Sequence, residues 1–225
     1  MVRATSINTC FIMDEEWPMR LTIKGIEEGK PIPAQFAFAV PDPEQHMRLS
    51  DNRNPEVRWL DAPQGTQSFV LLVTDPDVPG VADDVNQEGK SLPADLPRVD
   101  FYHWVLVDIP VEVNLIEEGE MADGVVPKGK TPGQTAKGIS GINGYTGFLA
   151  GDPDMAGVYG GYDGPCPPWN DEIVHRYTFS LFALDIPTLG LSGEFTGEQV
   201  REAMAGHVLA ESSITGTYTL NPDLR

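Results

Sequence analysis

The chain has 225 residues, of which 34 are Asp or Glu and 15 are Lys or Arg, so its formal net charge is −19 at neutral pH. Such an acidic surface repels a phosphate backbone, which argues against binding of nucleic acid. No apolar stretch approaches the roughly 18 to 20 residues of a membrane helix, and Met1–Glu16 lacks the basic start, apolar run and cleavage site of a signal peptide. We therefore expect a soluble, cytoplasmic protein with no integral membrane segment, folded as a single domain over residues 1–225.

The cysteines bear on the redox compartment of the protein, and the glycines and prolines bear on its secondary structure. Cys10 and Cys166 are too few for a disulfide framework and lack metal-ligand spacing, which is compatible with a reducing compartment. The 23 glycines and 20 prolines indicate many turns, but they stay below the level of a disordered chain. Long helices should therefore be scarce.

Three apolar runs predict the central strands, in chain order. Phe69–Val73 is unbroken and β-prone, as expected of a strand buried on both faces, and it stops at the turn Asp75-Pro76-Asp77. His103–Val107 follows, and a proline closes it shortly afterwards. Tyr177–Phe182 alternates between apolar and polar residues, which is typical of a strand.

The C-terminal part predicts one short helix and a last strand. Thr196-Gly-Glu-Gln199 has the pattern of a capping box, and an apolar face follows it from Val200 to Val208. Ser213–Leu220 has the composition of a strand. Together these elements predict a mainly β fold, a sandwich with a few short peripheral helices.

Three long segments between the predicted elements are expected to be loops. Residues 41–55 are charged and polar, residues 79–99 are acidic and rich in proline, and residues 117–162 are rich in glycine. Loops of this length in a compact domain are usually functional or mobile. Residues 79–99 contain too few apolar side chains to offset the entropy of ordering, so we expect them to form a mobile or partner-facing lid rather than part of the sandwich.

Four ionisable residues lie at the ends of the predicted strands, namely Asp75, Asp77, His103 and His175. One interpretation is a metal site, although no closely spaced histidine pair supports it. A second is that the aspartates cap a turn and the histidines are satisfied in the core. A third is that an aspartate orients a histidine and favours its charged form, which then holds an anion. This third interpretation predicts a raised pKa for both histidines.

The turn Gly164-Pro165-Cys166-Pro167-Pro168 is stiff, because each proline fixes its backbone. Its shape would be preset, which lowers the ordering cost of binding a ligand. Cys166 fits a small apolar filler here, and the alternative is a reactive thiol whose pKa His175 lowers.

These residues carry a resemblance to a known family. Asp75-Pro76-Asp77 after an apolar strand, His103-Trp104, Gly164–Pro168 and His175-Arg176-Tyr177 occur in this order and resemble the phosphatidylethanolamine-binding protein family. The sequence of the Gly164–Pro168 turn and the C-terminal tail resemble its bacterial and archaeal Raf-kinase-inhibitor-like branch. A second triplet, Asp152-Pro153-Asp154, follows no apolar strand and is expected to be a turn.

The resemblance implies an antiparallel β-sandwich with a small pocket for phosphate-like groups and phospholipid head groups at one end. It implies neither a cofactor nor a metal. Members of the family are named for binding lipids and for inhibiting kinases or proteases, so an effect on a partner protein is also implied, and the bacterial branch allows a homodimer. Carried over residue by residue, the ligand-binding residues are Asp75, Asp77, His103, Tyr162, Gly164, Pro165, Cys166, Pro167, His175 and Tyr177.

Two alternatives to a binding module stay open. One is a hydrolase with His103 or His175 as general base and Cys166 as nucleophile, although the sequence has no Gly-x-Ser-x-Gly elbow. The other is a protease or kinase inhibitor that acts through its long acidic loops.

Overall fold

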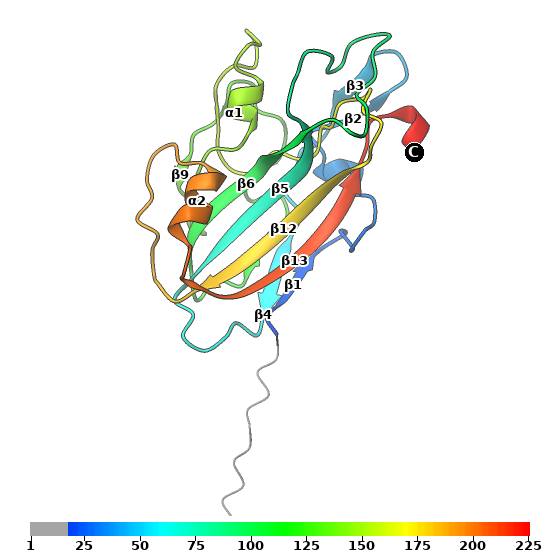
Figure 1. Ribbon diagram of the computed structural model, residues 1–225. Helices are drawn as coiled ribbons and strands as arrows, with labels where there is room; N and C mark the ends of the chain where they lie inside the picture. The colour runs from blue at the N-terminus through cyan, green and yellow to red at the C-terminus, as the bar shows by residue number, and fades with distance from the viewer. Residues whose placement is uncertain (1–17) are drawn as a thin grey trace, which may run out of the picture.

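The computed structural model describes residues 18–225, so the predictions made for Met1–Glu16 and for Cys10 lie outside the described part. Two antiparallel sheets form the body of the molecule (Figure 1). None of the helices in residues 18–225 is long and apolar enough to span a bilayer. The predicted mainly β architecture with few short helices is confirmed.

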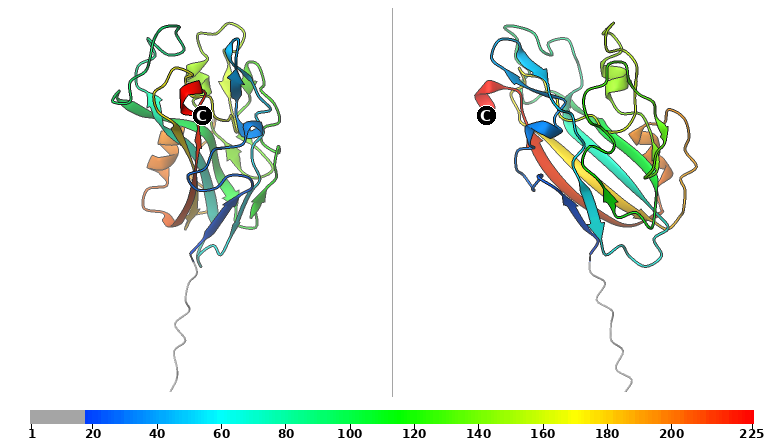
Figure 2. Two further views of the ribbon diagram at one scale, coloured as in Figure 1. Left: turned by 90° about the vertical axis from the view of Figure 1, so that its right-hand side faces the viewer. Right: turned by 180° about the vertical axis from the view of Figure 1, so that it is seen from behind.

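The large sheet has six strands in the order β13-β12-β5-β6-β10-β9, and every neighbouring pair is antiparallel. The smaller sheet has the order β1-β4-β7. Seen from behind in Figure 2, β1 and β4 lie in front of the large sheet, so the two sheets form the layers of a sandwich. The strands of both sheets are β1 (Arg20–Ile23), β4 (Val57–Leu60), β5 (Ser68–Pro79), β6 (Arg98–Pro110), β7 (Leu115–Ile116), β9 (Gly133–Gln134), β10 (Ile139–Ser140), β12 (His175–Leu184) and β13 (Val208–Tyr218).

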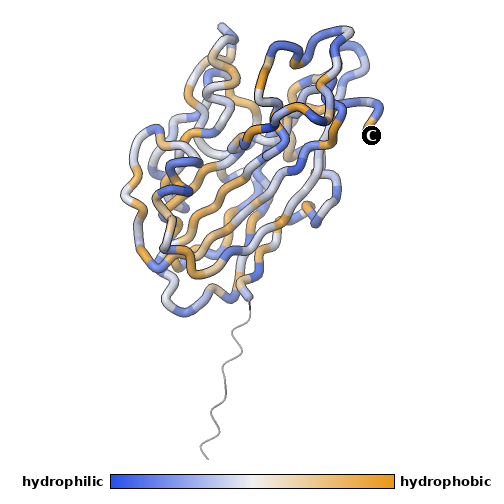
Figure 3. Tube along the Cα trace, viewed as in Figure 1, coloured by the Kyte–Doolittle hydropathy of each residue, from blue (hydrophilic) through white to orange (hydrophobic). Residues whose placement is uncertain are grey.

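Strand β5 explains how the apolar runs organise the core. Phe69, Leu71 and Val73 face the core between the two sheets, while Val70 and Leu72 belong to a second apolar cluster on the outer face. All five side chains are buried, as predicted for a strand covered on both faces. Figure 3 shows the hydrophobic residues concentrated along the strands of the large sheet and the hydrophilic ones in the loops.

The helix α2 (Gly197–Ala203) covers the outer cluster with Val200. Its predicted capping box is present, because Gln199 donates its backbone N–H to the Thr196 side chain and accepts the Thr196 backbone N–H in return. The predicted helical continuation to Val208 is wrong. Gly206, with a φ of +83°, turns the chain, and Val208 already belongs to β13.

Residues 41–55 are not entirely a loop as predicted, because β2 (Ala39–Asp42) and β3 (His46–Leu49) form a hairpin there. Asp42 closes its turn by accepting the backbone N–H groups of Glu44 and Gln45. Residues 117–162 are mostly irregular and hold short elements: β8 (Gly129–Lys130), β9, β10, α1 (Tyr145–Phe148) and β11 (Val158–Tyr159). Two short 3₁₀ helices lie at Ala34–Phe36 and Pro222–Leu224.

Hydrogen bonds and a buried side chain anchor the segment between β5 and β6 to the chain before β12, which argues against the mobile form of the predicted lid. A partner-facing lid stays a prediction. Leu92 is only 2% exposed, and its backbone exchanges hydrogen bonds with Asn170 and Glu172. The Asn170 side chain accepts the N–H of Asn86, and the Asn86 side chain accepts the N–H of Trp169. One buried leucine and two asparagines therefore tie this segment to the chain before β12.

Candidate functional site

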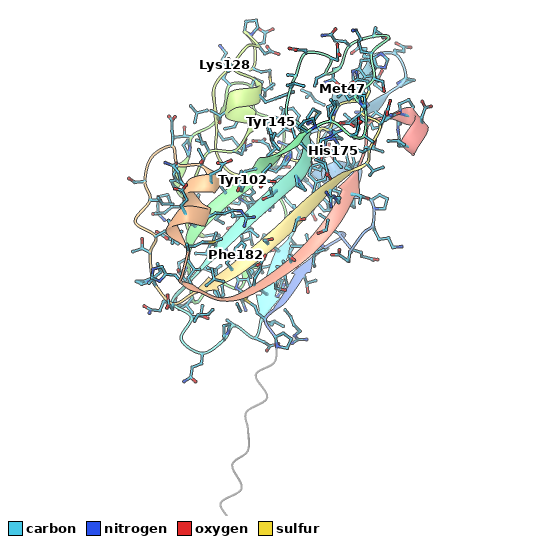
Figure 4. The ribbon with its side chains drawn as sticks, viewed as in Figure 1. Met47, Tyr102, Lys128, Tyr145, His175 and Phe182 are labelled. Carbon is cyan, nitrogen blue, oxygen red and sulfur yellow. The ribbon has the colours of Figure 1, made fainter. Side chains whose placement is uncertain are left out.

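A cavity of about 90 Å³ lies at the end of the large sheet where β12 begins and β5 ends. In Figure 4, the labelled His175 and Tyr145 lie at this end of the molecule, and Figure 1 places the β2–β3 hairpin and α1 at the same end. The volume suits a group of a few heavy atoms. The polar lining residues are Asp75, Asn86, His103, His175 and Tyr177, and the apolar ones include Val78, Val85, Phe101, Tyr145, Phe148 and Cys166.

The predicted site residues separate into two groups. Six of them line the cavity: Asp75, His103, Cys166, Pro167, His175 and Tyr177. The other four, Asp77, Tyr162, Gly164 and Pro165, do not line it.

His175 is a fully buried ionisable residue of the site. It is 0% exposed, its Nδ1 lies 2.7 Å from Asp75 Oδ2, and its Nε2 lies 3.1 Å from Asp171 Oδ2. Burial opposes the charged ring, but the hydrogen bonds and charges of Asp171 and Asp75 outweigh it and raise the pKa to about 9. The predicted raised pKa is therefore confirmed for His175. Both N–H groups of this cation are already donated to carboxylates.

Asp171 is a central residue of the site that the sequence motifs did not single out. Besides His175 it binds Arg98, with Arg98 Nη1 to Asp171 Oδ2 at 2.5 Å and Arg98 Nη2 to Asp171 Oδ1 at 3.0 Å. Burial raises the pKa of its carboxyl, but the hydrogen bonds from His175 and Arg98 outweigh burial and lower the pKa overall. The spacing of four residues to His175 was the available signal, and the Arg98 partner was too far away in sequence to suggest itself.

Asp75 and Asp77 have different roles. Asp75 Oδ1 accepts the backbone N–H of Asp77 while Oδ2 accepts from His175, so the histidine-orienting interpretation holds for Asp75. The predicted turn at Asp75-Pro76-Asp77 is wrong, because β5 continues to Pro79 with only a break in register between Asp75 and Val78. Asp77 pairs instead with Arg176, at 2.9 Å to Nε and 2.7 Å to Nη2. Burial raises the pKa of Asp77, but the bonds from Arg176 lower it overall.

His103 differs from His175 in its partner. Its Nδ1 lies 2.8 Å from the backbone carbonyl oxygen of Asp163, and its buried Nε2 has no hydrogen-bond partner within residues 18–225. Burial lowers the pKa of His103 below 6.5, and the charge of Asp75 only partly opposes this. The predicted raised pKa is therefore wrong for His103, because a carbonyl carries no full charge and Asp75 is held by His175.

The two predicted tyrosines also differ. The Tyr177 hydroxyl makes no hydrogen bond of good geometry in the described chain, although it lies close to the Asp75 carboxylate. Burial, followed by the charge and proximity of Asp75, raises its pKa well above 10. It is therefore a neutral group at the cavity wall. The Tyr162 hydroxyl donates to the Phe36 carbonyl at 2.6 Å, and its ring packs edge-on against Trp104, so Tyr162 supports the wall from within the core.

The turn Gly164–Pro168 contributes both scaffold and lining. A Cβ on Gly164 would lie 1.9 Å from the Phe36 carbonyl oxygen, so only glycine fits there. Gly164 donates its N–H to Asn52 Oδ1 at 2.8 Å, and the Pro165 carbonyl accepts the N–H of Phe38. These bonds hold the turn so that Cys166, Pro167 and Pro168 face the cavity.

The apolar wall was missed by sequence reasoning. Phe101, Tyr145 and Phe148 form a set of edge-on ring contacts, with centroid separations of 5.3 to 6.4 Å. They come from β6 and α1, and no motif links them along the chain. The second triplet, Asp152-Pro153-Asp154, is a turn as predicted, with Asp152 accepting the N–H of Asp154. Within residues 18–225 no group of three or more His, Cys, Asp or Glu side chains is arranged to hold a metal ion.

An antiparallel sandwich with a small, half-enclosed cavity at one end of its large sheet defines a class of ligand-binding β protein. The geometry combines a buried cation, its two carboxylates and two polar atoms that make no hydrogen bond within the described residues. The chain belongs to the phosphatidylethanolamine-binding protein family, whose family model matches residues 22–219. The resemblance inferred from the sequence motifs is therefore confirmed.

Individual relatives agree with this assignment. A UPF0098 protein of Aquifex aeolicus is 34% identical over 166 residues, which cover 73% of each chain. The crystal structure of the phosphatidylethanolamine-binding protein homolog CT736 of Chlamydia trachomatis matches with a TM-score of 0.59 and 27% identity, covering 89% of this chain and 97% of that one. Escherichia coli YbcL matches with a TM-score of 0.63 and 22% identity over 90% of this chain and 99% of its own, which shows a shared fold.

Proposed function

We propose that this chain binds a small oxyanion of the phosphate type in the cavity at the end of the large sheet. The observation that carries the proposal is a pair of buried polar atoms in its wall, His103 Nε2 and the Tyr177 hydroxyl, neither of which makes a hydrogen bond of good geometry within residues 18–225. Buried polar groups in proteins are nearly always hydrogen-bonded. A ligand with several oxygen atoms supplies the missing partners.

The chemistry of the wall supports an oxyanion. Tyr177 remains a phenol at neutral pH, so its hydroxyl can donate to an anionic oxygen. The family is named for binding a phospholipid, whose head group contains a phosphate. His175 does not serve as the direct ligand that the third interpretation required, because both of its N–H groups are committed; it holds Asp75 in place beside the cavity.

The apolar wall supports an organic group attached to the oxyanion. Phe101 and Phe148 line the cavity, and Phe148 is 52% exposed at its mouth. Ring faces of this kind pack against an aryl or alkyl substituent. We expect dissociation constants in the high micromolar to millimolar range, because a protein of charge −19 gains nothing from long-range attraction of an anion.

The hydrolase alternative is weaker than binding. Burial raises the pKa of Cys166 to about 12, so its thiol stays protonated at neutral pH and is a poor nucleophile. His175 is a cation without a free nitrogen and cannot act as the general base. His103 has a free Nε2, so the case against a hydrolase rests on the protonated Cys166 thiol and not on the histidines. An effect on a partner kinase or protease remains a prediction from the family resemblance, as does a homodimer.

The experiment is a calorimetric titration of phenyl phosphate into the wild type and Tyr177→Phe. Loss of a hydrogen bond to an anion costs about 1.5 to 3 kcal/mol, so the variant should bind about 10- to 100-fold more weakly. Tyr218→Phe is the matched control, because its hydroxyl donates to the Ala39 carbonyl and does not line the cavity. Equal affinity of wild type and Tyr177→Phe would place the ligand elsewhere.

A further inference from the structure

We propose that the cavity binds its oxyanion together with one proton, which lies between a ligand oxygen and His103 Nε2. This inference rests on the proposed function and names the ligand class more narrowly. The preferred ligand is a phosphomonoester in its monoanionic form, which carries its own P–OH group.

The hydrogen-bond geometry fixes which nitrogen of His103 faces the ligand as an acceptor. Nδ1 lies 2.8 Å from the Asp163 carbonyl oxygen, and a carbonyl oxygen can only accept. Nδ1 therefore carries the hydrogen. In the neutral ring, Nε2 then carries no hydrogen and presents a lone pair. Nε2 is the buried atom at the cavity wall that makes no hydrogen bond within the described residues.

Hydrogen bonds hold Asp163 in place, so its carbonyl oxygen stays directed at His103 Nδ1 and the hydrogen stays on that nitrogen. Asp163 is 0% exposed, and its N–H donates to the His103 carbonyl at 3.0 Å. Its carboxylate accepts from Lys130 Nζ at 2.6 Å and from the Asn52 and Asn143 side chains, each at 2.8 Å. The carbonyl that orients His103 is thus fixed by four hydrogen bonds around a single residue.

The charged and titratable groups around His103 do not favour a second proton on the free ring. Asp75 on β5 attracts one, but it is neutralised by the His175 cation on β12, which repels one. The Asp163 carboxylate is paired with Lys130. The remaining neighbours are protonated and neutral: Tyr145 on α1, Tyr177 on β12 and Cys166 on the turn before β12.

An oxyanion without a proton would place its lone pairs against the lone pair of Nε2 and against Asp75. A phosphomonoester has a second pKa of about 6, so its monoanion brings the required proton at mildly acid pH. A phosphodiester has no P–OH, so His103 itself must take up a proton from solvent against the effect of burial. The cavity should therefore prefer a monoester monoanion to a diester of the same size.

The test compares phenyl phosphate with methyl phenyl phosphate by calorimetry at about pH 6 and about pH 8, each in two buffers of different ionisation enthalpy. Phenyl phosphate should bind about 50-fold more weakly at about pH 8, because its monoanion falls from about one half to about 1% of the total. About one proton per ligand should be taken up at the higher pH. At the lower pH the diester should bind more weakly than the monoester.

His103→Gln provides the matched variant, because its amide can place an N–H donor near the position of Nε2 without taking up a proton. Its affinity for phenyl phosphate should change less than about threefold over the same pH range. His207→Gln is the control and should keep the wild-type pH dependence, since His207 pairs with Asp185 outside the cavity. If His103→Gln does not fold, the proton uptake of the wild type and its preference for the monoester over the diester test the inference without the variant.

The outcomes separate the two proposals. Equal binding of both esters without proton uptake would overturn this inference and leave the proposed function standing. No binding of either ester at about 10 mM would overturn the proposed function and, with it, this inference. Tighter binding of ethylammonium than of either ester would also overturn both, because the buried acceptors would then hold a cation.

Discussion

Replacing His175 by Gln tests the buried cation on which the site is built. Burial opposes the charge of this imidazole, yet Asp171 and Asp75 raise its pKa from 6.5 to about 9. Each unit of pKa shift is worth about 1.4 kcal/mol, so this shift in the pKa of His175 corresponds to about 3 kcal/mol of stability. Because the folded pKa lies above the unfolded one, this stability is fully present below about pH 6.5 and is lost as the pH rises through about 9.

Urea denaturation followed by tryptophan fluorescence measures the effect. The unfolding free energy of the wild type should fall by about 2 to 3 kcal/mol between about pH 6 and about pH 9.5. His175→Gln should lose this component of the pH dependence and should be less stable by about 3 to 5 kcal/mol at the lower pH, because two buried carboxylates lose their cation. His207→Gln should run parallel to the wild type, since this histidine is partly exposed outside the cavity.

A direct titration covers the case in which His175→Gln does not fold. NMR of the wild-type ring should place the pKa of His175 at about 9. An unfolding free energy of the wild type that stays constant over this pH range, or a ring that titrates near its ordinary 6.5, would refute the reasoning.

Two further predictions concern the scaffold of the cavity. Gly164→Ala should destabilise the protein by about 3 kcal/mol or more, because the added Cβ would lie 1.9 Å from the Phe36 carbonyl oxygen. The control Gly147→Ala should leave the stability unchanged, because its Cβ would meet no atom within 4 Å. Equal melting temperatures for the two variants would contradict the account. Leu92→Ala should lower the free energy of unfolding by about 2 kcal/mol or more in denaturant unfolding and weaken binding of phenyl phosphate. The control Val81→Ala lies in the same segment but is 59% exposed, so it should change the free energy of unfolding by less than about 0.5 kcal/mol. An unchanged free energy of unfolding in Leu92→Ala would mean that the segment is a free lid.

The sequence predicted the parts of the fold that leave a local pattern. The unbroken apolar run of β5 and the capping box at Thr196 each express a contact within a few residues or a simple burial rule. The β2–β3 hairpin was missed because its prolines and charges hide the strand pattern, although the Asp42 turn was a visible signal.

The site was predictable in its residues but not in their partners. The pairing of Asp75 with His175 was one of the interpretations open from the sequence, whereas Arg98 and Asp171 meet across 73 residues without any motif. The state of His103 depends on a backbone carbonyl, which no residue type reveals. The tautomer of His103 could therefore be assigned only from the structure.

The most direct test of the account is the ¹⁵N spectrum of the histidine rings during addition of phenyl phosphate at about pH 6.5. Without ligand, His103 should show an unprotonated Nε2 and a protonated Nδ1, and His175 should show two protonated nitrogens. Saturation should move His103 Nε2 toward a hydrogen-bonded or protonated shift and leave His175 unchanged. A ligand that saturates the protein while His103 Nε2 stays unchanged would contradict the central claim.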